Sequence, residues 1–224
     1  MGKQNNSYQL KQNIMTTKIS YEDQFERAIS PAQAATLERY IKIFSVNGTA
    51  KRKEEYRKGK RIHLIYYRDP DEPVEAILAE NKLFPTIEIR ERHRVGNYVR
   101  VDDSEYVDGV LLFKGISVFD RKGNEIYSSP IDAVTNLHNY EETHKYFYDD
   151  HNKKLYVFWY GTNGQLSFMM SYNPNHDPYL NEFKQDFRLE DLPGLPGFNW
   201  PEMEYYHHAE PVVPVNSCSS KIGS

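Results

Sequence analysis

The stretch that decides the fold reads Tyr56-Arg57-Lys58-Gly59-Lys60, and the strand-like run Arg61-Ile62-His63-Leu64-Ile65-Tyr66-Tyr67 follows it. Glycine reaches the backbone angles that a tight turn needs, and β-branched and aromatic residues fit a pleated strand. The stretch is therefore typical of a β-hairpin whose turn lies at Gly59.

The same order of aromatic residue, glycine turn and apolar run recurs along the chain. Three further copies begin at Tyr106, Phe119 and Tyr160. Successive turn glycines, such as Gly48 and Gly59, lie 11 to 14 residues apart, which is the length of one strand and one turn. The spacing predicts an antiparallel meander, a curved sheet of about eight or nine strands.

Three segments carry helix signals, so the predicted fold class is α+β. Ser30-Pro31 is typical of a helix start, and an apolar stripe with three- and four-residue steps follows it at Ala34, Leu37, Ile41 and Phe44. This pattern predicts an N-terminal helix. Two short inserted helices are expected over residues 73–81 and after Ser129-Pro130, where the stripes are Val74, Ile77 and Leu78, and Ile131, Val134 and Leu137.

Changes of composition along the chain predict three regions. Residues 1–20 are polar and are expected to form a flexible leader, and residues 21–190 to form a single α+β domain. Residues 191–224 are rich in proline, which excludes regular central strands, and are expected to form an irregular C-terminal tail. A short helix is predicted near residues 179–187.

Composition excludes several classes of protein. Of the 224 residues, 39% are hydrophobic, which is enough for a packed core, and no apolar run approaches the length of a membrane helix. The single cysteine, Cys218, excludes a disulfide framework. A cytoplasmic location is therefore predicted, with no membrane association.

Charge is divided unevenly along the chain. Residues 1–100 hold 19 Lys and Arg against 13 Asp and Glu, a net charge of +6. Residues 101–224 hold 9 against 19, a net charge of −10, so the overall −4 hides an acidic second half. Charged turns can protect a sheet from aggregation, and an acidic face can also attract a basic protein.

The hairpin at Tyr56-Arg57-Lys58-Gly59-Lys60 resembles the MORN-type repeat. It is also similar to the looser hairpin repeats of bacterial antitoxin and immunity proteins. The resemblance covers roughly residues 47–172, although the repeat spacing is uneven and helix signals interrupt it. It implies a protein-binding role and supplies no catalytic residues.

Motifs for catalysis are absent from the sequence. It holds no phosphate-binding glycine loop, no dinucleotide-binding turn and no nucleophile elbow, and no cofactor is predicted. The one candidate metal cluster is His138, His144 and His151, next to Asp149 and Asp150. If these side chains converged, a metal-dependent hydrolase would be the alternative function, and an intracellular scaffold is a third possibility.

The favoured interpretation is a non-enzymatic bacterial immunity or antitoxin-like protein that occludes a basic toxin domain. The aromatic strands near residue 159 could stack nucleic-acid bases, but their surroundings are acidic, which disfavours that partner. Carboxylates and interface-type aromatic residues of the acidic half are the predicted contacts. They are Asp102, Asp103, Asp149, Asp150, Trp159 and Tyr160.

Overall fold

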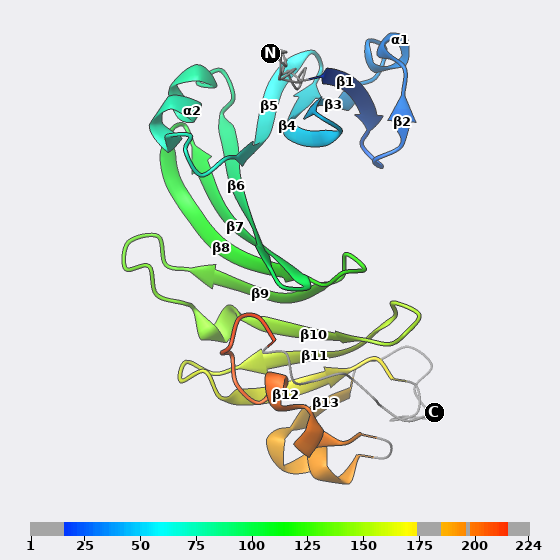
Figure 1. Cartoon of the computed structure of the whole chain (residues 1–224), viewed down its shortest axis with the longest axis vertical. Coiled ribbons are helices and arrows are strands. Elements are labelled where there is room, and N and C mark those ends of the chain that lie inside the picture. The colour runs from blue at the N-terminus through cyan, green and yellow to red at the C-terminus, as the bar shows by residue number, and fades with distance from the viewer. Residues whose placement is uncertain (1–15, 174–184, 196–197, 215–224) are drawn as a thin grey trace, which may run out of the picture. The chain divides into compact units, whose positions relative to one another are not determined.

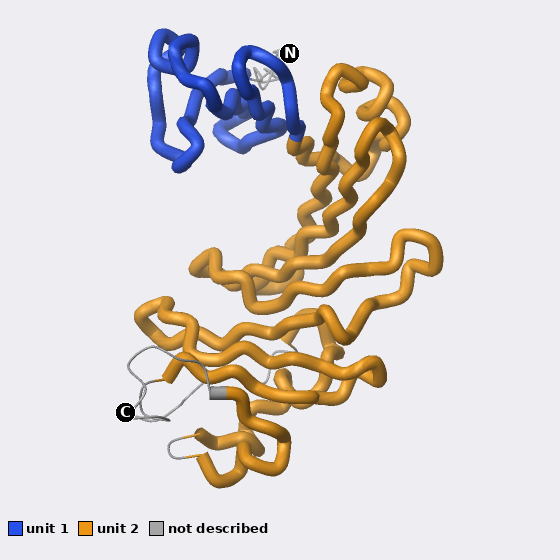
Figure 2. The backbone as a smooth tube through the Cα atoms, turned by 180° about the vertical axis from the view of Figure 1, so that it is seen from behind, with its two compact units in different colours: residues 1–64 blue, residues 65–224 orange. Residues whose placement is uncertain are grey.

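The computed structural model describes residues 16–173, 185–195 and 198–214, which form 13 β-strands and few helices. Figure 1 shows the elements in chain order. The predicted antiparallel, strand-rich fold is confirmed, and the predicted number of eight or nine strands is wrong. The chain divides into two compact units, one ending at Leu64 and one beginning at Ile65 (Figure 2).

The first unit is a small antiparallel sheet with the strand order β2-β1-β3-β4. Its elements are β1 (Thr17–Asp23), β2 (Ala28–Ile29), α1 (Pro31–Ala34), β3 (Arg39–Val46) and β4 (Thr49–Arg57). Strand β5 (Lys60–Arg68) follows and carries the chain into the second unit.

The predicted N-terminal helix is wrong beyond its first turn. Ser30 does cap a helix, since its Oγ accepts from the Gln33 amide at 3.2 Å and Gln33 Oε1 accepts from the Ser30 amide at 2.8 Å. That helix, α1, ends at Ala34. Ile41 and Ile43 lie in β3, because β-branched residues that alternate with other side chains prefer a strand.

The second unit is a meander in which each strand pairs with the next, in the order β6 to β13. Its regular elements are α2 (Val74–Glu80), β6 (Thr86–Val95), β7 (Tyr98–Val107), β8 (Val110–Phe119), β9 (Glu125–Ile131), β10 (His144–Tyr148), β11 (Lys154–Tyr160), β12 (Leu166–Ser171) and β13 (Gln185–Arg188). The 3-10 helices are η1 (Tyr140–Glu142), η2 (Leu189–Gly194), η3 (Trp200–Glu202) and η4 (Glu204–Tyr206).

Of the two predicted inserted helices, the first is confirmed as α2, with Ile77 buried. The second is wrong, because Ser129 and Pro130 lie inside strand β9. The residues after β9 form a loop in which Asp132 Oδ1 accepts from the Val134 amide at 3.0 Å, and the Val134 side chain is 89% exposed. An apolar stripe with no surface to cover gives a helix little stability.

The helix predicted near residues 179–187 falls largely on residues 174–184, which lie outside the described part of the chain, and Gln185–Arg188 is strand β13. Cys218 also lies outside it.

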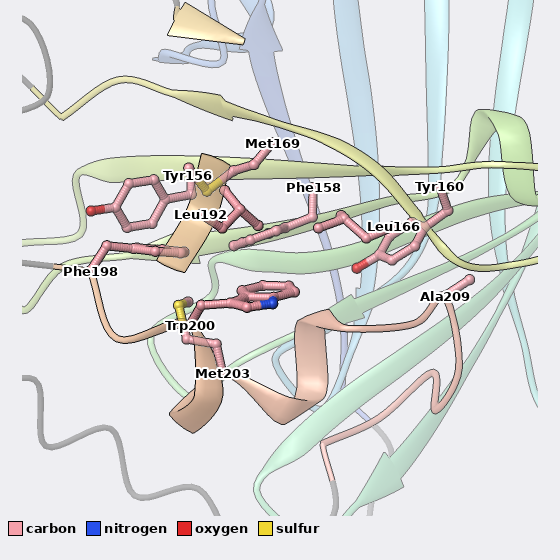
Figure 3. Close-up of a cluster of buried hydrophobic side chains, with 10 residues drawn as sticks. All are labelled: Tyr156, Phe158, Tyr160, Leu166, Met169, Leu192, Phe198, Trp200, Met203 and Ala209. Carbon is pink, nitrogen blue, oxygen red and sulfur yellow. The ribbon is translucent and has the colours of Figure 1, made fainter. Parts of the chain in front are cut away.

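One face of the β10–β12 region carries the main core of the second unit (Figure 3). Tyr156, Phe158 and Tyr160 alternate along β11 and point to this face. The described residues after β13, here called the C-terminal segment, cover them with five buried side chains. These are Leu192, Phe198, Trp200, Met203 and Ala209. Proline leaves this segment without strand geometry, yet its aromatic and apolar side chains fill the core.

Lys145, on β10, fastens the same segment to the sheet. Its ammonium is fully buried and donates to the carbonyl oxygens of Tyr205, His208 and Pro211 at 2.6, 2.9 and 2.9 Å. It also lies 3.8 Å from the centre of the Tyr205 ring. These acceptors and this ring replace the water that the ammonium loses on burial. The segment thereby closes one face of this part of the sheet.

An acidic groove on the open sheet face

A groove of about 440 Å³ lies over strands β7 to β11, on the face opposite the C-terminal segment. Directly paired residues of an antiparallel sheet point to the same side. Ser117 pairs with Ser128, Ser128 with His144 and His144 with Trp159, so these four side chains share the open face. All four side chains are partly exposed.

The floor of the groove is built from small residues of β8 and β9. Gly115 pairs with Asp103 on one side and with Pro130 on the other. A Cβ placed on Gly115 would lie 2.8 Å from the Phe113 ring, so the ring rests directly over the glycine. Glycine within a strand allows this close approach. The Phe113 side chain itself is 45% exposed, which leaves it open to a ligand.

Asp103 forms one wall, and one of its oxygens is a buried acceptor without a donor in the described part of the chain. The Nε atom of Arg90 lies 3.1 Å from Asp103 Oδ1, yet its single hydrogen points to Glu88 Oε1 at 2.5 Å. The contact to Asp103 is therefore an ion pair without a hydrogen bond.

Burial is the main reason that the pKa of Asp103 rises to about 6. Arg90 opposes this rise, whereas the negative charges of Glu88, Asp102 and Glu125 add to it. A carboxylate whose ionised form is destabilised in this way gains from a cation that approaches it.

His144 and Trp159 form the opposite wall. Their rings meet edge to face with centroids 3.8 Å apart, and Phe168 stacks on Trp159 at 5.3 Å. His144 Nε2 and Trp159 Nε1 are buried and have no hydrogen-bond partner among the described residues. Burial lowers the pKa of His144, so the imidazole is neutral at pH 7.

Two further carboxylates complete the lining. Glu125 accepts a hydrogen bond from Ser117 Oγ at 2.7 Å, which holds it over the floor, and Glu142 extends from η1 beside His144. The groove thus combines three carboxylates, an exposed phenyl ring and an indole N–H that lacks an acceptor. This set of groups suits a cation whose attached chain offers a carbonyl oxygen.

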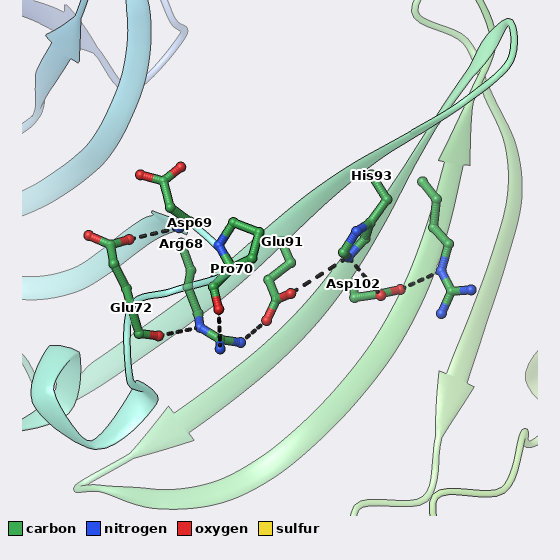
Figure 4. A network of polar contacts seen from close by, with 8 residues as sticks. Arg68, Asp69, Pro70, Glu72, Glu91, His93 and Asp102 are labelled. Atoms are coloured by element: carbon green, nitrogen blue, oxygen red, sulfur yellow. Dashed lines mark hydrogen bonds and ion pairs between the residues drawn. The ribbon is translucent and has the colours of Figure 1, made fainter.

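The structure brings two of the six predicted contact residues together, Asp103 and Trp159. Asp102 points to the other face of β7, where its carboxylate pairs with Arg100 at 2.7 Å and with His93 at 3.3 Å (Figure 4). The polar chain continues from His93 through Glu91 to Arg68. Asp102 is therefore engaged within the sheet.

The remaining three predicted residues lie elsewhere in the second unit. Asp149 Oδ1 accepts from the amides of His151 and Lys153 at 2.9 and 2.8 Å, so its side chain holds the β10–β11 turn. Asp150 is exposed at the same turn. Tyr160 is buried beneath the C-terminal segment, and its hydroxyl donates to the Tyr206 carbonyl at 3.0 Å.

The three histidines of the alternative metal site are separated. His138 Nδ1 lies 3.2 Å from Ser129 Oγ beside the covered face, His144 lines the groove and His151 is exposed in a turn. In the described ranges, no group of three or more His, Cys, Asp or Glu side chains could hold a metal ion.

Sequence reasoning missed Phe113, Gly115 and Glu125, and it interpreted the neighbouring pair Glu141 and Glu142 as charged turn residues. The signal that could have found them is Gly115, because a glycine inside a strand marks a bulge or a close approach. That Gly115 lies opposite Asp103 follows only from the register of β7 and β8. A bulge near Tyr106 shifts this register from the one that the turn at Gly109 would give.

Comparison with known proteins shows no match to a family model, to a curated protein or to a solved structure. Among the described residues, helices are too short and too polar for any of them to traverse a lipid bilayer.

Proposed function

We propose that this chain is a non-enzymatic protein-binding module of the bacterial immunity or antitoxin type, which works in the cytoplasm and neutralises a basic partner by covering it. The observation that carries the proposal is the acidic groove, in which buried polar atoms of Asp103, His144 and Trp159 lack hydrogen-bond partners in the described part of the chain. Unsatisfied buried polar atoms cost free energy in the isolated protein, and a bound partner can recover that cost.

Charge supports the same role. The second half of the sequence carries a net −10, and the groove concentrates Asp103, Glu125 and Glu142 on one open face. A field of one sign accelerates encounter with a partner of the opposite sign and disfavours acidic partners.

The test uses the product of the gene adjacent to the one that encodes this chain. The two proteins are co-expressed and purified, and their dissociation constant is measured at low and high salt. We expect a stable complex that is weaker at high salt, because exposed charges are screened. No complex with that gene product, together with no protection of cells from it, would contradict the proposal.

Matched variants locate the contact. Glu142→Gln removes a groove carboxylate, and Glu141→Gln removes an exposed carboxylate of the same 3-10 helix that does not line the groove. Asp103→Asn and Asp102→Asn make a second pair on opposite faces of β7. We expect the groove variant of each pair to weaken the complex and its neighbour to leave it unchanged.

A further inference from the structure

We propose that the groove receives an arginine side chain from the protein partner, with the guanidinium between Asp103 and the exposed Phe113 ring and the adjoining backbone against Trp159. The inference rests on the proposed function, since it names the chemistry by which this groove recognises its partner.

The place of the guanidinium follows from the strand register. Gly115 is directly opposite Asp103, and the tip of the Phe113 ring rests over Gly115, so carboxylate and phenyl ring adjoin. Arginine is planar and presents several N–H donors at its edge, which lets it stack on a ring while it pairs with a carboxylate. Asp103 Oδ1 still lacks a donor within the described residues.

The chain already builds this arrangement with its own arginine. In the first unit, the guanidinium of Arg52 lies 4.1 Å from the centre of the Phe44 ring and 2.9 Å from Glu54 Oε1. Phe44 and Arg52 are paired across β3 and β4. In the groove, Arg90 pairs with Asp103 from β6, whereas the residue opposite Asp103 on β8 is Gly115. The described lining of the groove therefore holds a phenyl ring and a carboxylate with no arginine between them.

The opposite wall of the groove, at Trp159, indicates that the bound guanidinium belongs to a peptide. Trp159 Nε1 is a donor only, it is buried, and it lacks an acceptor in the described ranges. A guanidinium has no acceptor to offer it, whereas the carbonyl of a neighbouring peptide bond does. The groove therefore matches an arginine within a chain segment better than free arginine.

The test is titration of the full-length protein with four probes, followed by NMR of the tryptophan indole N–H signals. The probes are the peptides Gly-Gly-Arg-Gly-Gly, Gly-Gly-Lys-Gly-Gly and Gly-Gly-citrulline-Gly-Gly, and ethylguanidinium, which carries the guanidinium without a carbonyl group. Trp159 and Trp200 are the two tryptophans, and Trp200, buried in the opposite core, is the internal reference.

We expect the arginine peptide to shift the Trp159 signal and leave that of Trp200 in place. The citrulline peptide, which has the same shape without the charge, should bind about tenfold more weakly, as loss of a charge-assisted hydrogen bond implies. Equal binding of the arginine and citrulline peptides, or of the arginine and lysine peptides, overturns the inference. Equal binding of ethylguanidinium overturns the role of the partner backbone.

Variants tie the binding to the groove. Asp103→Asn and Phe113→Leu should each weaken the arginine peptide, and Asp102→Asn should not. A shift that persists in Asp103→Asn also overturns the inference.

The two proposals can fail separately. A full partner protein whose affinity is unchanged by Asp103→Asn contradicts the arginine inference and leaves the protein-binding role intact. Selective binding of the arginine peptide, with no complex from the adjacent gene product, supports the groove chemistry and contradicts the immunity role.

Discussion

At the scale of single residues, two neighbouring aspartates show what a strand does to a sequence motif. Asp102 and Asp103 look alike in the sequence, but β7 directs the first into a chain of polar contacts with Arg100 and His93 and the second into the groove. Because successive side chains of a strand point to opposite faces of the sheet, these two side chains are predicted to point in opposite directions. Which of them meets the open face depends on where the C-terminal segment lies, and that is a long-range property.

Asp103→Asn should stabilise the protein at neutral pH. The pKa of Asp103 is about 6 in the folded state against an ordinary 3.8, so between these values the folded state holds more protons than the unfolded state. The free energy of unfolding therefore falls as pH rises through this window. Allowing for solvent screening, we expect Asp103→Asn to raise the free energy of unfolding by about 1–2 kcal/mol at pH 7 and to leave it unchanged near pH 4.

Urea denaturation of both proteins at the two pH values measures this gain. Asp102→Asn is the control and should bring no gain. A destabilised Asp103→Asn protein at pH 7 would show that the carboxylate contributes to the fold itself, and that it is not held for a partner.

Binding should also depend on the protonation of Asp103. Below pH 6 the carboxyl gains a proton and loses its attraction for a cation, so the affinity for the arginine peptide should fall by up to about tenfold per pH unit. Calorimetric titration at pH 7 and pH 5 measures the change. A pH dependence that is the same in Asp103→Asn would assign the effect to another group.

At the scale of elements, the hairpin turns could be predicted and the first helix could not. Gly59, Gly109, Gly123 and Gly164 all have the positive φ angles that their turn positions in the sequence implied. The stripe from Ala34 to Phe44 misled because Ile41 belongs both to its three- and four-residue steps and to a two-residue alternation with Ile43. Ile41 and Ile43 instead follow the two-residue period of β3.

The C-terminal segment could not be predicted as part of the core. Its proline spacing indicated irregular structure, and the 3-10 helices η2 to η4 are short. What orders Trp200 and Met203 is contact with strands β11 and β12, more than thirty residues earlier in the chain. Local sequence patterns do not specify such long-range contacts.

Lys145→Met tests how this segment is held. Methionine fills a similar volume but leaves one buried and two partly buried carbonyls without this donor, and an unsatisfied buried acceptor costs about 1–3 kcal/mol. We expect a loss of stability of at least about 2 kcal/mol and faster amide exchange over residues 205–211. Lys153→Met, at an exposed turn position, should change neither.

The pH dependence of stability distinguishes this lysine further. Burial lowers the pKa of Lys145 from 10.5 to about 7, so between these values the unfolded state binds more protons than the folded state. The free energy of unfolding should therefore rise with pH in this window. That rise should be absent from Lys145→Met. A rise of the same size in both proteins would contradict the assignment to Lys145.

At the scale of the whole molecule, the sequence shows an uneven division of charge. The division into a basic first hundred residues and an acidic remainder predicted a basic partner for the second part. It could not predict the groove, because Asp103, Glu125 and Glu142 come from three different segments of the chain. The sheet register and η1 bring them to one place.

Long-range attraction should then be separable from groove binding. Asp150 is exposed in the β10–β11 turn, and its side chain does not hold that turn, as that of Asp149 does. Asp150→Lys should slow association with the basic partner and flatten its salt dependence, with little change in the dissociation rate. Stopped-flow measurement at several salt concentrations tests this. A change confined to dissociation would place Asp150 within the contact itself.

The hydrogen bonds from Lys145 to the C-terminal segment also have a consequence for the order of folding during synthesis. Each strand of the meander pairs with the next, so hairpins can form as the chain leaves the ribosome. Lys145 is synthesised about sixty residues before Tyr205, His208 and Pro211, whose carbonyls accept its hydrogen bonds. Until they emerge, its ammonium must stay in water and the aromatic face of β11 stays uncovered. A segment that is synthesised after all the strands of the sheet is therefore the one that completes this core.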